Sequence, residues 1–134
     1  MVKISANRLD METKRLERPQ MKNYTETLVT VAAVASTTLD VSLGNVFALS
    51  QDTSITTLTI SNIPATGTVC SITIIRTHDA TATTFTIAWP AAFKWAAATA
   101  PTLTQAANAV DIINATTKDG GTTWYAFAAG LNLS

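Results

Sequence analysis

From Glu26 onward, short runs rich in threonine and β-branched residues alternate apolar with hydroxyl side chains. The clearest is residues 70–74, where Cys70, Ile72 and Ile74 alternate with serine and threonine. A period of two places the apolar side chains on one face of a strand, whereas a helix needs a period of 3.6 residues. A chain built from such runs is expected to fold into β-sheet rather than helices.

The pattern recurs in eight stretches and predicts an all-β fold: an antiparallel β-sandwich of about eight strands, similar in plan to a jelly roll. A Greek-key sandwich would give the same pattern, so the strand order stays open. Turn signals separate the stretches, as tight connections require. The predicted strands span residues 26–34, 37–41, 46–49, 55–61, 68–77, 83–89, 109–117 and 122–128.

Local signals refine this plan. The sequence Asp-Gly-Gly at 119–121 favours a tight turn, because glycine adopts positive φ without steric cost. It predicts that residues 109–117 pair antiparallel with 122–128. The alanine-rich stretch 90–101 has a proline at each end and is predicted to be a long loop over the sandwich. Cys70 alternates inward with apolar neighbours and is expected to be buried and inert.

The first 22 residues differ in charge from the rest, although the formal net charge of the chain is zero. They carry a net charge of +3 and the remainder −3, which predicts a basic N-terminal arm (1–24) and a β-sandwich domain (25–134). Good helix formers at 6–17 predict a short helix in the arm, which Pro19 ends. The basic residues of the arm are Lys3, Arg8, Lys14, Arg15, Arg18 and Lys22.

Such an arm fits docking onto an acidic surface, either of a neighbouring copy or of a different protein. The alternative is an ordinary solvated terminus. The apolar residues of the arm do not repeat in heptads, so no coiled-coil stalk is predicted.

The chain is poor in charge, with 13% charged residues against 25 threonines and 22 alanines. A surface covered by hydroxyl and methyl groups is unusual for a lone monomer and predicts that one sheet face is buried by homotrimerisation. No apolar run reaches the roughly 18 residues that would span a bilayer, and zero net charge gives no general attraction to nucleic acid. Neither a membrane nor a nucleic acid is expected as a partner.

No catalytic or metal-binding constellation is found in the sequence. The only histidine, His78, stands beside Asp79 in a polar stretch and is interpreted as a solvated turn residue. The aspartates are scattered singly, and a phosphate-binding glycine loop and a nucleophile motif are both lacking. The chain is therefore expected not to be an enzyme and to need no cofactor or metal.

Aromatic residues cluster in and near the 90–101 stretch. Trp89 and Trp124 are expected to anchor the core, which leaves Trp95 exposed. The alternative is a stacking platform for sugar rings. Phe93 and Trp95 are accordingly the candidate residues of an aromatic contact surface.

Seven segments, in their order along residues 19–134, resemble a β-sandwich module that recurs in virion proteins of tailed bacteriophages. They are Asn-Tyr-Thr-Glu-Thr at 23–27, Thr-Leu-Asp-Val at 38–41, Gly-Asn-Val-Phe at 44–47, Trp-Pro-Ala-Ala-Phe-Lys-Trp at 89–95, Ala-Pro-Thr-Leu-Thr at 100–104, Asn-Ala-Val-Asp at 108–111 and Asp-Gly-Gly-Thr-Thr-Trp-Tyr at 119–125. The chain departs from the module in carrying three alanines at 96–98, where glycine is expected.

The resemblance implies a non-enzymatic, usually homotrimeric protein on the particle surface, made in the host cytoplasm. One hypothesis is a capsid decoration (cement) protein whose basic arm grips the major capsid protein. The other is a small tail-fibre or tail-tip protein that joins the tail or baseplate and contacts the host surface, including its glycans. A polysaccharide hydrolase is disfavoured, because no close pair of carboxylates is evident.

Overall fold

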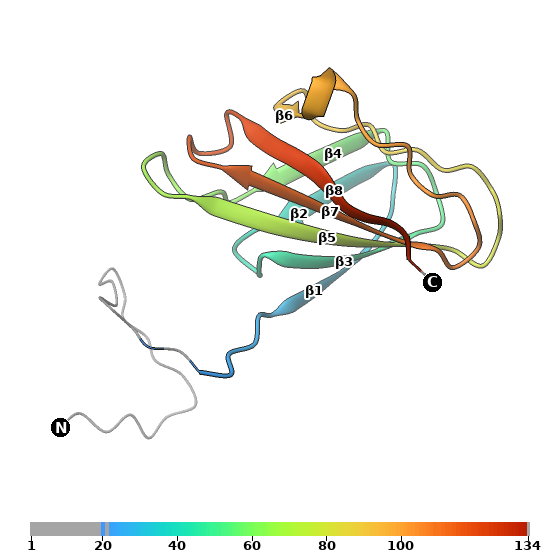
Figure 1. The fold of residues 1–134 in the computed structure, drawn as a ribbon, viewed down its shortest axis with the longest axis horizontal. Coiled ribbons are helices and arrows are strands. Elements are labelled where there is room, and N and C mark those ends of the chain that lie inside the picture. The colour runs from blue at the N-terminus through green and yellow to red at the C-terminus, as the bar shows by residue number, and fades with distance from the viewer. Residues whose placement is uncertain (1–19, 21, 134) are drawn as a thin grey trace.

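The computed structural model describes residues 20 and 22–133, which form two stacked β-sheets of unequal size (Figure 1). The smaller sheet pairs β2 (Ser36–Asp40) with β4 (Thr57–Ser61). The order of the six-stranded sheet is β1 (Leu28–Ala32), β3 (Val46–Gln51), β5 (Cys70–His78), β7 (Val110–Thr117), β8 (Trp124–Leu133) and β6 (Phe93–Lys94). The all-β class is confirmed, and the described residues form eight strands, seven of them overlapping predicted stretches.

Strand direction differs from the prediction. β1, β3 and β5 are parallel neighbours, β2 and β4 are parallel, and only β5, β7 and β8 pair antiparallel. The predicted antiparallel sandwich is therefore wrong in this respect, and the large sheet is mixed. The reason is the route of the chain, which passes through the small sheet between successive strands of the large one and so returns in the same direction each time.

The predicted hairpin is confirmed. β7 and β8 pair antiparallel, with Ile113 opposite Ala128 and Thr116 opposite Tyr125. The turn between them uses left-handed backbone at both glycines of the Asp-Gly-Gly sequence, with φ of 67° and 85°. The turn chemistry thus fixed the one long-strand pairing that is local in sequence.

The core lies between the two sheets and is built from the inward positions of the alternating runs. Cys70 and Trp124 are buried in it, as predicted. Its other large members are Leu39, Phe47, Leu49, Ile55, Leu58, Ile72, Ile74, Ile87, Phe93, Leu103 and Ile113.

The structure also differs from the prediction in the long segment that joins β5 to β7. Residues 83–89 are not a strand, since their only ladder contact is a single parallel bridge between Ile87 and Ile55. The predicted loop 90–101 contains β6 and a short 3-10 turn, Ala96–Ala98. Within that turn Ala97 and Ala98 adopt left-handed φ of 51° and 54°. These are the alanines that stand where the phage module leads one to expect glycine.

The predicted arm helix at 6–17 lies outside the described residues, as do five of the six basic arm residues, Lys3, Arg8, Lys14, Arg15 and Arg18. The sixth, Lys22, is exposed. None of the helices in the described part of the chain is both long and apolar enough to span a membrane.

Candidate functional site

The most distinctive surface of the protein is the outward side of the six-stranded sheet, called here the outer face. Cross-strand partners align its side chains in rows; one row runs from Leu28 through Val46, Thr73 and Asn114 to Phe127. Across its five long strands the outward residues are Leu28, Thr30, Ala32, Val46, Ala48, Ser50, Ser71, Thr73, Ile75, Thr77, Val110, Ile112, Asn114, Thr116, Tyr125 and Phe127. None of these sixteen residues is an acid or a base, and the charged residue on this side of the sheet is Lys94 of the short edge strand β6, beside Tyr125.

Large apolar side chains stand exposed on this outer face. Tyr125 and Phe127 on β8 each expose more than half of their surface, as does Leu28 on β1, at the other side of the sheet. Leu133, at the end of β8, is 42% exposed and lies close to Gly130. Single exposed apolar residues are ordinary, but several of them on a face whose five long strands carry no charge are typical of an interaction surface. Sequence reasoning missed Phe127 and did not assign Tyr125 to an exposed sheet face, although the alternation was available: with Trp124 inward, both must point outward.

Asn114, on β7, is a polar residue of the outer face with a side-chain oxygen that is unsatisfied within the described residues. Its side-chain oxygen is buried, yet no described residue donates a hydrogen bond to it. An unpaired buried acceptor costs about 1–3 kcal/mol. A donor supplied from outside the described residues would remove that cost.

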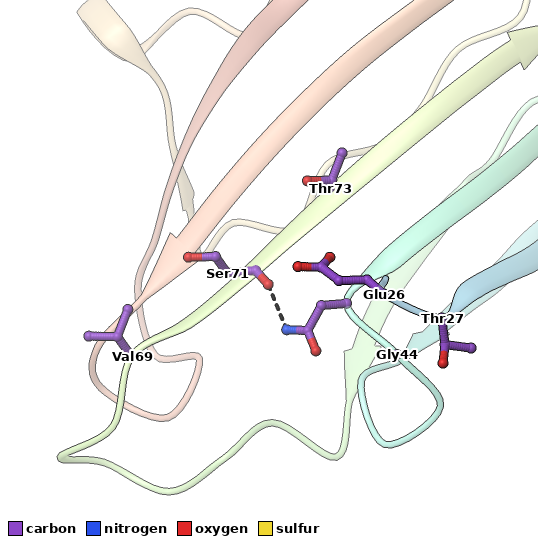
Figure 2. A pocket seen from close by; sticks show the side chains of 7 residues that line it. Glu26, Thr27, Gly44, Val69, Ser71 and Thr73 are labelled. Atoms are coloured by element: carbon purple, nitrogen blue, oxygen red, sulfur yellow. Dashed lines mark hydrogen bonds between the residues drawn. The ribbon is translucent and has the colours of Figure 1, made fainter. Parts of the chain in front are cut away.

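A polar pocket of about 550 Å³ borders the outer face where β1, β3 and β5 begin (Figure 2). Its floor is fixed by Asn45, whose amide donates to the carbonyl oxygen of Ser71 at 2.7 Å. Gly44 is required there, because a Cβ would come within 2.9 Å of the carbonyl oxygen of Thr27. Among the described residues that line the pocket, Glu26 is the acidic one and none is basic.

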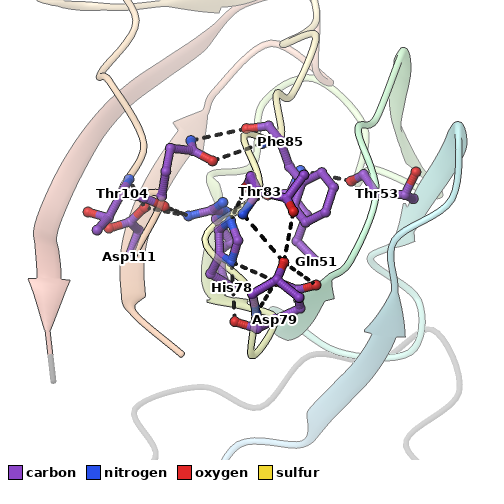
Figure 3. A network of polar contacts seen from close by, with 11 residues as sticks. Gln51, Thr53, His78, Asp79, Thr83, Phe85, Thr104 and Asp111 are labelled. Atoms are coloured by element: carbon purple, nitrogen blue, oxygen red, sulfur yellow. Dashed lines mark hydrogen bonds and ion pairs between the residues drawn. The ribbon is translucent and has the colours of Figure 1, made fainter. Parts of the chain in front are cut away.

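A second polar cluster is buried inside the protein at the opposite end of the large sheet (Figure 3). Arg76 and Asp111 are fully buried, with 2.9 Å between Nη1 and Oδ2. The same Arg76 Nη1 donates to the carbonyl oxygen of Thr104 at 2.6 Å, and Nε contacts Gln51. Asp111 also accepts the backbone N–H groups of Thr104 and Asn132 at 2.8 and 3.0 Å.

Burial by itself raises the pKa of Asp111, because it removes water from the carboxylate. The N–H groups of Asn132 and Thr104, together with the charge of Arg76, outweigh burial and hold the pKa below its ordinary value of 3.8. Asp111 is therefore charged in the folded protein at neutral pH. The cluster ties the segment after β5 to the sheet.

His78 belongs to the same end of the sheet, and its predicted place in a solvated turn is wrong. The side chain is 1% exposed, its Nε2 lies 2.8 Å from the carbonyl oxygen of Thr83, and its Nδ1 lies 3.0 Å from Asp79 Oδ1. The ring also stacks on Phe85 at a centroid distance of 5.2 Å. The reason is that residues 79–109 fold back over the end of β5 instead of leaving it in solvent.

This cluster binds residues 79–109 to the end of the large sheet. Most of its hydrogen-bond partners are backbone atoms of that segment. Cys70 is not part of the cluster and lies elsewhere in the core. The described residues contain no group of three or more metal-ligating His, Cys, Asp or Glu side chains.

The two residues of the candidate aromatic contact surface, Phe93 and Trp95, differ in exposure. Phe93 is 5% exposed and packs on Trp124 in the core, so it cannot contact a ligand as expected. Trp95 is half-buried and meets Trp89 edge-on at a centroid distance of 5.2 Å. Among the described residues, the aromatic side chains that expose more than half of their surface are Tyr24 and, on the outer face, Tyr125 and Phe127.

Comparisons of the chain with protein-family models, with curated proteins and with solved structures found no match.

Proposed function

We propose that the protein is a non-enzymatic structural subunit of a bacteriophage particle, displayed on its surface as a homotrimer. The observation that carries this proposal is the outer face, whose five long strands present no acid or base to the outside. A sheet face five strands wide without an acid or a base is suited to burial against protein and poorly suited to permanent contact with water.

The occupant of the outer face is a second copy of the chain. Burial of a Leu or Phe side chain stabilises an interface by roughly 1.5–3 kcal/mol, and the face exposes several such groups. Its threonines and Asn114 supply hydrogen bonds in a contact that has no ion pairs to align. Three copies that share this face would place it along the trimer axis and leave the small sheet outward.

Within this proposal the protein is a capsid decoration (cement) protein anchored by its basic arm. The arm has a net charge of +3 and the rest of the chain −3. An acidic capsid subunit would therefore attract the arm and repel the sandwich domain. The resemblance to the phage virion module supports the same class of protein. The major capsid protein is the partner that the arm would grip.

A small tail-fibre or tail-tip protein is the second candidate. It is supported by the same resemblance and by Trp95, which keeps part of its ring at the surface of the loop over the sandwich. In that role the loop would contact glycans of the host surface.

Copy number per particle separates the two candidates. Quantitative gel or mass-spectrometric analysis of purified particles should give hundreds of copies for decoration and a few dozen or fewer for a tail protein. Particles that lack the protein should lose resistance to heat or salt but still adsorb to cells. Robust particles that fail to adsorb would contradict the cement role and support the tail.

The arm is tested by charge removal rather than by deletion. Replacing Lys14, Arg15 and Arg18 by glutamine should lower occupancy on particles, and wild-type occupancy should fall with salt because exposed ion pairs are screened within about 10 Å at 0.1 M. The control variant is Lys118→Gln, which removes an exposed positive charge from the sandwich domain and should leave occupancy unchanged. Arg76 cannot serve as the control because it is buried. Unchanged occupancy of the triple variant would exclude an electrostatic anchor.

A further inference from the structure

A groove of about 330 Å³ runs between two extended stretches of the long segment that follows β5. Residues 84–87 and Trp89 form one wall, and residues 100–103 with Gln105 form the other. Apolar and threonine side chains make up most of this lining, and no acidic or basic residue contributes to it. The groove belongs neither to the outer face nor to the pocket beside Glu26.

One wall of the groove is an extended stretch of chain that bonds to Ile55 on its other side. Thr86 accepts a hydrogen bond from Ile55 N–H at 2.9 Å, and Ala88 donates to the carbonyl oxygen of Ile55 at 2.8 Å. Backbone groups alternate in direction along an extended chain, so those of Phe85 and Ile87 point the opposite way, toward the groove. In the part of the chain that the structure describes, the N–H and C=O of Ile87 have no hydrogen-bond partner.

Gln105 holds the two walls apart. Its side-chain oxygen accepts from Phe85 N–H at 2.8 Å, and its side-chain nitrogen donates to the carbonyl oxygen of Phe85 at 3.1 Å; both bonds at Phe85 are visible in Figure 3. This pair of bonds is what a neighbouring strand would make. Because a whole glutamine side chain stands between the two backbones, they lie farther apart than the ~4.8 Å of directly paired strands.

We propose that the groove is a vacant strand position, filled by residues 2–6 of a neighbouring copy of this chain. An extended segment placed there would pair with the free N–H and C=O of Ile87, which is recognition by β-strand addition. The inference rests on the proposed function only in requiring more than one copy in the assembly.

The sequence of residues 2–6, which lie outside the described residues, suits this position. Val2, Ile4 and Ala6 alternate with Lys3 and Ser5, the period-two pattern of a strand with one apolar face. An uncharged groove takes the apolar face, and the polar face turns to solvent.

The position of the arm favours a neighbouring copy over the same chain. The groove-bearing segment follows the C-terminal end of β5, and β1, β3 and β5 are parallel, so the N-terminal end of β1 lies at the other end of the sheet (Figure 1). Each arm thus leaves its own body at the end of the sheet opposite its own groove. Exchange of arms would tie each copy to the next by main-chain hydrogen bonds.

Disulfide trapping in the full-length chain tests the proposal. Ile4→Cys chains are mixed with epitope-tagged Thr102→Cys chains, whose new cysteine lies on the groove wall, and the mixture is oxidised. Neighbouring strands bring Cα atoms within the 4.4–6.8 Å that a disulfide needs. We expect a tagged mixed dimer at least about tenfold more abundant than with the control Thr38→Cys, an exposed position on β2.

A synthetic peptide of residues 1–7 should compete and lower the mixed-dimer yield several-fold. The same peptide with Ile4→Pro should compete poorly, because proline cannot donate to a ladder. Yields equal for Thr102→Cys and Thr38→Cys, in a chain that light scattering shows to be oligomeric, overturn the inference and leave the proposed function standing.

Two further outcomes are decisive. If a doubly substituted Ile4→Cys, Thr102→Cys chain closes only an intrachain disulfide, each groove is filled by its own arm and the exchange is wrong. If light scattering finds only monomers, the trimer fails, and binding of the labelled peptide to Thr38→Trp but not to Thr102→Trp chains still decides whether the groove accepts a strand.

Discussion

Arg76 and Asp111 are direct cross-strand partners on β5 and β7, and their side chains form an ion pair of 2.9 Å that is wholly buried. Both side chains point inward. The other inward side chains of β5 and β7 are apolar, apart from one histidine and one threonine. The pair holds the returning segment through Thr104 and the C-terminal strand through Asn132. Its removal should therefore destabilise the packing of β5 on β7, the segment that contains Thr104 and the C-terminal strand β8.

Asp111→Ala should lower the free energy of unfolding by about 3–5 kcal/mol, because it leaves the Arg76 charge buried without a partner. Urea unfolding followed by circular dichroism measures the change. The double variant Arg76→Met, Asp111→Leu should recover part of the loss, since it removes the uncompensated charge but still deprives two backbone N–H groups of their acceptor. A single-variant loss below about 1 kcal/mol would contradict this account.

The stabilising effect of Asp111 should depend on pH with a defined sign. Its pKa lies below the ordinary value of 3.8 in the folded protein, so the stability it contributes is present above about pH 4 and is lost as the pH falls through the folded pKa. The difference in unfolding free energy between wild type and Asp111→Asn should be constant from pH 5 to 7 and shrink at lower pH. A difference that grows on acidification would show the opposite shift.

Ala97→Gly should stabilise the protein, although glycine usually weakens folded structure. Left-handed backbone costs a residue with a Cβ roughly 1–2 kcal/mol, and Ala97 has φ of 51°. The larger entropy of glycine in the unfolded chain offsets part of the gain, which leaves roughly 0.5–1 kcal/mol. The matched control is Ala96→Gly in the same 3-10 turn, where φ is negative and the substitution should destabilise. Equal effects on the melting temperature would contradict the argument.

Phe127→Arg should weaken self-association without unfolding the chain. The side chain is exposed on β8 of the outer face, so a charge there leaves the isolated subunit intact but must be desolvated in a contact with another copy. Light scattering should show a shift toward monomer at micromolar concentration. Leu43→Arg, at an equally exposed position in the turn after β2, should leave the oligomer unchanged. If both variants keep the wild-type mass, the outer face is not the interface.

Alternation of side chains predicted the faces of the strands but not their neighbours. Cys70, Ile72 and Ile74 point inward as expected, since burial of one face holds in any sheet. Parallel and antiparallel pairing give the same alternation, so nothing in β1 or β3 revealed that they run in one direction. Only the Asp-Gly-Gly turn carried information on direction, and it predicted the one local pairing correctly.

The polar core could have been found in part. Arg76 follows Ile72 and Ile74 with period two, and Asp111 precedes Ile113 in the same way, so both were inward by the rule used for Cys70. His78 follows the same period and was misread because Asp79 and the threonines after it favour a turn. What no local pattern shows is that residues 79–109 return to cover this end of the sheet.

The route of the chain has a consequence for its synthesis. Strands β1 to β5 can pair in order as they leave the ribosome, because β3 and β5 each add to a strand of the large sheet that is already made and β4 adds to β2. The other edge of β5 must wait for β7, and residues 79–109 take roughly 2–6 s to make at 5–20 residues per second. During that interval the edge of β5 is unpaired in a growing chain, and open edges pair with other chains. The moment of greatest risk of aggregation thus falls before the protein is complete, between its fifth and seventh strands.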